Sequence, residues 1–101
     1  MFAGFVNLGA TLNGAFVVKN SQESPVNADA LPTFRVYGPS GLMQYGTGIA
    51  TVLDSSQPGL YAYQISVDPG NGYEVGTSYK VFINATVLGT PVAYEQSFIV
   101  T

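Results

Sequence analysis

Apolar side chains recur at every second position along much of this chain, a period typical of β-strands and not of helices. Residues 59–67 (GLYAYQISV) and 78–87 (SYKVFINATV) show the alternation over their whole length. Shorter β-rich runs lie at residues 4–8, 11–19, 33–37, 49–53 and 92–100. We therefore expect about seven strands. At most one helical turn is expected, at residues 27–31.

The alternation also predicts which side chains form the core, because residues of one parity share one face of a strand. Four of the expected strands, at residues 33–37, 59–67, 78–87 and 92–100, each have one face on which apolar residues recur. The residues expected to be mainly buried are Phe34, Val36, Tyr61, Tyr63, Ile65, Tyr79, Val81, Ile83, Phe98 and Val100.

Turn residues separate these runs at intervals of 8–12 residues, which favours a sandwich or a barrel. The segments GPSG (38–41), DSSQPG (54–59) and DPGNG (68–72) are rich in Gly, Pro, Asp and Asn. Gly89 and Thr90 are expected at the centre of a tight hairpin, with Gly in the first central position. Residues 20–32 are expected to form an extended crossover. A length of 101 residues indicates one domain.

Composition argues against catalysis and cofactor binding. The chain has no His, Cys or Trp, so the commonest general base, the thiolate nucleophile and the best transition-metal ligands are missing. The six acidic residues lie in or beside predicted turns or on strand faces, with nothing in the sequence to raise a pKa. We expect a protein that is not an enzyme, with no catalytic residues, no metal and no cofactor.

Charge is sparse, at 9% of residues, with a net charge of −3. Lys19, Arg35 and Lys80 are scattered, so neither a nucleic-acid footprint nor a polybasic lipid-binding segment is predicted. A surface so poor in charge favours a protein that works inside an assembly. A secreted or surface domain with a face rich in Thr, Ser and Asn is an equally good interpretation of the composition.

The first ten residues, MFAGFVNLGA, are apolar but lack a basic segment and are broken by Gly4, Asn7 and Gly9. They predict neither a signal peptide nor a transmembrane span. Residues 1–10 are interpreted as an N-terminal arm or edge strand, and residues 11–101 as the β-sandwich. We expect deletion of residues 1–9 to weaken assembly more than folding.

Tyr79 begins a late strand just after Gly76, a spacing that favours a tyrosine corner. In that device the phenol bonds to a backbone group a few residues upstream. An ordinary half-buried strand tyrosine is the alternative.

Several large apolar residues fall on faces predicted to be polar. Clustered on a surface with few charges, they would form a protein-binding patch. The candidate binding residues are Phe2, Phe5, Tyr37, Tyr45, Phe82, Tyr94 and Ile99.

Three segments carry a family resemblance: SPVNADALPTFRVYGPSG at 24–41, GLYAY at 59–63 and NGYEVGTSYKV at 71–81. They resemble small immunoglobulin-like domains of tailed-phage structural proteins, and they are also similar to fibronectin type III and macroglobulin-like sandwiches. The resemblance covers most of residues 11–101. It implies a single immunoglobulin-like Greek-key β-sandwich of about seven antiparallel strands.

The resemblance also implies a function, because such family members include capsid decoration (cement) and tail accessory proteins. We expect a non-enzymatic virion protein that docks on a shell through its sandwich surface and N-terminal arm. Its implied partners are the major capsid protein or other virion subunits, with self-association a further option, and neither nucleic acid nor membrane. The alternative is a carbohydrate-binding or adhesin module on a phage tail or cell surface.

Overall fold

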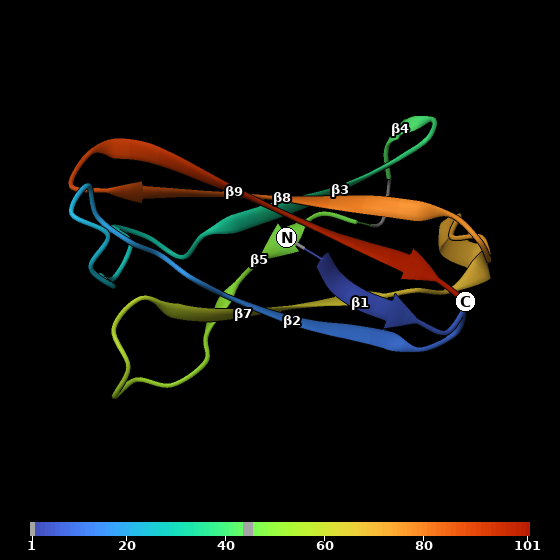
Figure 1. Cartoon of the computed structure of the whole chain (residues 1–101), viewed down its shortest axis with the longest axis horizontal. Coiled ribbons are helices and arrows are strands. Elements are labelled where there is room, and N and C mark those ends of the chain that lie inside the picture. Colours follow the sequence, from blue (N-terminus) through green and yellow to red (C-terminus); the bar gives the residue numbers. More distant parts are fainter. Residues whose placement is uncertain (1, 44–45) are drawn as a thin grey trace.

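The computed structural model describes residues 2–43 and 46–101, which form two packed β-sheets (Figure 1). The larger sheet has the strand order β1-β9-β8-β3-β4, and β5 also pairs with β3. The smaller sheet has the order β2-β7-β6. The strands are β1 (Phe2–Val6), β2 (Thr11–Val17), β3 (Thr33–Gly38), β4 (Gly41–Leu42), β5 (Gly48–Ile49), β6 (Thr51–Val52), β7 (Leu60–Ser66), β8 (Ser78–Val87) and β9 (Thr90–Val100). The predicted all-β class is confirmed.

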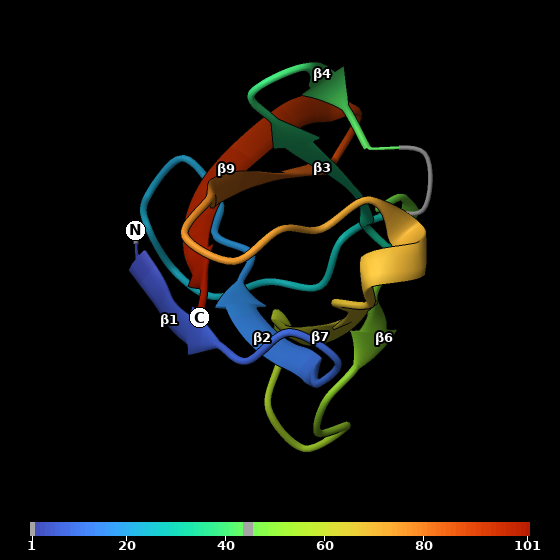
Figure 2. The same cartoon turned by 90° about the vertical axis from the view of Figure 1, so that its right-hand side faces the viewer.

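The strand count and direction differ from the expectation in three places. The two-residue strand β4, which pairs with β3, was not expected. The single strand expected at residues 49–53 is divided, because β5 pairs with β3 in the larger sheet and β6 pairs with β7 in the smaller one. The fully buried Ala50 lies between them, where the chain changes sheet. In addition, β1 runs parallel to β9, so the sandwich is not wholly antiparallel (Figure 2).

The prediction of a helical turn at residues 27–31 is wrong, because this segment forms hydrogen bonds with other parts of the chain and not within itself. The Asn27 side chain accepts the Gly59 N–H at 2.9 Å, and the Asp29 N–H donates to the Thr86 carbonyl at 2.8 Å. The helical element among the described residues is instead the 3-10 turn η1 (Pro69–Asn71), within the predicted 68–72 loop.

The β8–β9 hairpin turns one residue earlier than expected. Val87 pairs with Thr90, so Leu88 and Gly89 are the two central residues. Both have positive φ, 49° and 80°. Positive φ at both positions is the type I′ pattern, whose twist matches that of the flanking strands. The strand twist therefore selects this turn, although Leu is a poor residue for its first central position.

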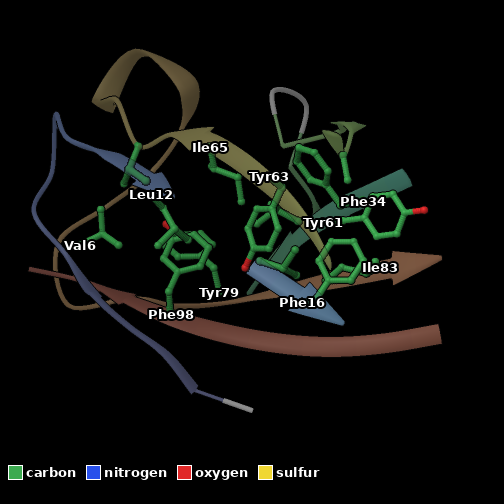
Figure 3. Packing of buried hydrophobic residues seen from close by; sticks show 14 of the residues in the cluster. Val6, Leu12, Phe16, Phe34, Tyr61, Tyr63, Ile65, Tyr79, Ile83 and Phe98 are labelled. Carbon is green, nitrogen blue, oxygen red and sulfur yellow. The ribbon is translucent and has the colours of Figure 1, made fainter. Parts of the chain in front are cut away.

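All ten residues predicted to form the core are buried. Figure 3 shows several of them, among them Phe34, Tyr63 and Phe98, packed between the sheets. Aromatic rings from both sheets fill the space between the layers. Tyr79 stacks on Phe98 with ring centroids 5.4 Å apart, and Phe16 stacks on Tyr61 at 5.8 Å. Tyr73, in the loop after η1, is also buried, and the alternation did not predict it.

A polar bridge joins the two sheets inside this core. The Tyr63 hydroxyl on β7 donates to Oε1 of Gln96 on β9, and Nε2 of Gln96 donates to the Ala15 carbonyl on β2 at 3.0 Å. Gly14 makes room for the bridge, because a Cβ there would lie 2.1 Å from Cζ of Tyr63. The buried amide of Gln96 is thereby hydrogen-bonded at both ends, as buried polar groups require.

The predicted tyrosine corner is confirmed. The Glu74 N–H, five residues upstream, donates to the Tyr79 hydroxyl at 2.9 Å. The following Gly76 N–H donates to the Val100 carbonyl at 2.7 Å. These bonds fix the loop that carries the chain from the smaller sheet into β8.

Candidate docking surface

The outward side chains of β3, β8 and β9 form the outer face of the larger sheet. Phe82 on β8 lies opposite Arg35 on β3 and Glu95 on β9. Its ring meets the ring of Tyr37 edge-on, with centroids 5.2 Å apart and planes at 88°. Edge-to-face contact is a preferred aromatic geometry, so the two rings hold one another in place at the centre of this face.

A β-bulge in β1 turns two further aromatic rings onto the same face. Residues 2 and 5 of a regular strand would point to opposite faces. Here Phe2 aligns with Ser97 and Phe5 with Ile99, and the register shifts between Phe2 and Gly4. Gly4 accommodates the bulge with φ of 122°.

The two phenylalanine rings produced by this bulge lie next to each other. Their centroids are 5.2 Å apart. The side chains are 49% and 67% exposed. An edge strand thus presents an apolar pair to solvent, beside Ile99. We call Phe2, Phe5, Tyr37, Phe82 and Ile99 the outer aromatic face.

Charge is distributed unevenly around this face. Lys80 and Glu95 form an exposed ion pair there, with Nζ and Oε1 3.4 Å apart. Arg35 also points outward from β3. Two of the three basic residues of the chain therefore lie on this face, with one acid, whereas the other five acids lie in loops. The face is locally slightly basic on a protein of net charge −3.

One of the predicted binding residues does not join this face. Tyr94 has the parity of Phe98 and Val100 and so points between the sheets, where its ring lies 6.2 Å from Phe16. Its hydroxyl accepts the Lys19 N–H at 3.0 Å. The outward placement of Tyr94 is corrected accordingly. Tyr45 lies outside the described residues.

Two exposed residues extend the face and were missed from the sequence. Leu42 pairs with Tyr37, and Ile49 pairs with Thr33, so both point outward. They are 54% and 65% exposed. Each belongs to a strand of two residues, which is too short to show an alternation. No signal in the sequence could have placed them.

The strongly shifted titratable groups are buried phenols away from this face. Burial raises the pKa of Tyr63 to about 12. Burial also raises the pKa of Tyr73 to about 12, with a smaller contribution from neighbouring Tyr79. Within residues 2–43 and 46–101, no group of three or more acidic, His or Cys side chains is placed to hold a metal ion. The chemistry that this surface offers is apolar contact with a few charges.

Comparisons with family models, with curated proteins and with solved structures found no match for this chain. In the described part of the chain, no helix has the length and apolar character needed to span a bilayer.

Proposed function

We propose that this chain is a non-enzymatic docking module, a capsid decoration protein of a virion, that binds its shell through the outer aromatic face. The observation that carries the proposal is the bulge in β1, which turns both Phe2 and Phe5 outward beside Ile99. Exposed apolar groups clustered on one face are typical of protein-binding sites. The virion setting follows from the family resemblance of residues 24–41, 59–63 and 71–81.

The finer fold assignment belongs to the same proposal. An immunoglobulin-like Greek key is supported by the β2-β7-β6 sheet packed on a sheet containing β3, β8 and β9. The bond between Glu74 and Tyr79 at the start of β8 supports it too. The charge distribution suits a partner surface that is mainly apolar and carries acidic groups opposite Arg35 and Lys80, which lie among the aromatic rings.

Binding to assembled shells tests the proposal. The source genome is first searched for a major capsid protein gene near this chain, and its absence counts against the proposal. Where the gene is present, the shell that its product forms is the probe. Phe82→Ser should weaken binding at least tenfold, because central aromatic residues dominate interface energies. Val75→Ser is the matched control, since Val75 is 63% exposed but lies in the loop before β8. Equal binding by wild type and Phe82→Ser, or no binding by wild type, would remove the outer aromatic face from this role.

A carbohydrate-binding module is the second candidate, and one observation favours it. An open cleft of about 730 Å³ lies where the smaller sheet meets β5 and Phe34 of the larger sheet. The uncharged polar side chains of Asn13, Thr51 and Gln64 form part of its lining. Neutral hydrogen-bonding groups over a shallow floor suit sugar hydroxyls. Glycan-array binding that Gln64→Ala abolishes and Phe82→Ser leaves unchanged would select this candidate.

A further inference from the structure

The tip of the β8–β9 hairpin carries a residue that its local structure does not favour. Leu88 has φ of 49°, in the left-handed region that Gly and Asn adopt far more readily. Its side chain is 90% exposed, the largest exposure among the large apolar residues described. Within one molecule, the unfavourable backbone conformation of Leu88 is therefore not offset by burial of its side chain.

The neighbouring loop holds this turn in place from outside. Oδ1 of Asp29 accepts the Leu88 N–H, and Oδ2 accepts the Gly89 N–H, both at 2.9 Å. The Asp29 N–H donates to Thr86 at 2.8 Å. Figure 1 shows this loop, in cyan, beside the hairpin at the left end of the molecule. Because the turn is fixed, the Leu88 side chain projects at a defined position, and little backbone freedom is lost when a partner binds it.

A hollow lies beside the same tip. Its volume is about 230 Å³, which is larger than a leucine side chain. None of the described residues that line it is ionisable. The lining residues are Ala30, Leu31, Thr33, Asn84, Ala85, Thr86, Pro91 and Val92. Leu31 is 49% exposed there, so one rim of the hollow is apolar.

We propose that this end of the sandwich is a self-association site, in which Leu88 of one copy enters the hollow of a second copy around a two-fold axis. A two-fold contact requires that one patch carry both the projecting and the receiving group. Leu88 and the hollow meet that requirement at one end of the sandwich, where the β8–β9 hairpin lies beside residues 30–33. The hollow lies on the same side of the larger sheet as the outer aromatic face, next to Phe82, but none of the five residues of that face lines it. The proposal does not rest on the proposed function.

The affinity expected of this contact is modest, because a hairpin tip covers less area than a standard interface. A weak two-fold contact becomes effective when copies are held close together, since the second contact is then intramolecular. The dimer should therefore appear in solution only towards high protein concentration.

Sedimentation velocity of the full chain over a range from micromolar to millimolar tests the proposal. Wild type should shift from monomer to dimer. Leu88→Asn should stay monomeric, with a dissociation constant raised at least tenfold, while its melting temperature is unchanged or higher because Asn-Gly suits a type I′ turn. Leu88→Met should retain the dimer. Thr86→Trp, which fills the hollow from an exposed strand position, should abolish it.

Four results would overturn the proposal. Wild type could remain monomeric over the whole range. Leu88→Asn could associate as wild type does, or Thr86→Trp could do so. A clear loss of melting temperature in Leu88→Asn would show that the leucine stabilises its own monomer, which removes the reason for a partner.

Discussion

Tyr73 and Tyr79 touch in the core, yet their hydroxyl groups are in opposite situations. The rings meet edge-on with centroids 5.0 Å apart. The Tyr79 hydroxyl accepts the Glu74 N–H, whereas the Tyr73 hydroxyl is buried without a hydrogen-bond partner among the described residues. A satisfied buried hydroxyl stabilises a fold modestly, and an unsatisfied one destabilises it. The same chemical group therefore has effects of opposite sign at two adjacent sites.

Removing each hydroxyl should show this difference. Tyr79→Phe leaves the Glu74 N–H without its acceptor and should lower the free energy of unfolding by about 1–2 kcal/mol. Tyr73→Phe removes an unpaired polar group and should raise the free energy of unfolding, by about 1 kcal/mol. Urea unfolding of the two variants measures both changes. A Tyr79→Phe midpoint equal to that of wild type would show that the corner bond contributes nothing.

Strand β1 shows two different environments within one element. Val6 is 6% exposed and belongs to the core, and the Leu8 N–H after it donates to the Thr101 carbonyl at 3.0 Å. Phe5, one residue before Val6, is 67% exposed on the outer aromatic face. The segment expected to be an arm or an edge strand is thus an edge strand. Because β1 pairs with β9 and Val6 lies in the core, we expect deletion of residues 1–9 to weaken folding as well as assembly.

Substitutions on the two sides of β1 should separate folding from docking. Val6→Ala removes two buried methyl groups and should lower the free energy of unfolding by about 2 kcal/mol. Phe5→Ser should change it by less than about 0.5 kcal/mol, because exposed positions contribute little. Thermal melting and shell binding are measured together. Strong destabilisation by Phe5→Ser would mean that its ring supports the monomer, against its assignment to docking.

The long strands were predictable because each carries its own alternation, as residues 78–87 do over the whole of β8. The strands β4, β5 and β6 have two residues each and exist because a longer neighbour offers them backbone partners. The bulge in β1 could not be predicted from the sequence either, since it depends on how β1 aligns with β9. Tyr94 was misplaced for a different reason. Its inward orientation follows from the parity of Phe98, so the signal was present in the sequence.

At the scale of the whole molecule, the two sheets enclose phenols whose ionisation is linked to folding. Burial raises the pKa of Tyr63 and of Tyr73 to about 12, whereas a tyrosine in an unfolded chain has a pKa of about 10. Between these values the unfolded chain loses protons that the folded chain keeps. The free energy of unfolding then falls as pH rises, because a higher pH favours the unfolded state, which binds fewer protons. The contribution is fully present below about pH 10 and is lost as the pH approaches about 12.

We therefore expect cooperative alkaline unfolding of the sandwich between about pH 10 and about pH 12. The phenolate absorbance of Tyr63 and Tyr73 is obtained by subtracting the titrations of Tyr63→Phe and Tyr73→Phe from that of wild type. It should change together with circular dichroism, because these two buried hydroxyls ionise only when the sheets separate. Tyr73→Phe removes one of the two linked groups, so its free energy of unfolding should fall less steeply with pH than that of wild type. Phe5→Ser, which removes no titratable group, is the control and should keep the wild-type slope. Phenolate absorbance of Tyr63 and Tyr73 that develops before the loss of β-structure would show that the core admits the charge without unfolding.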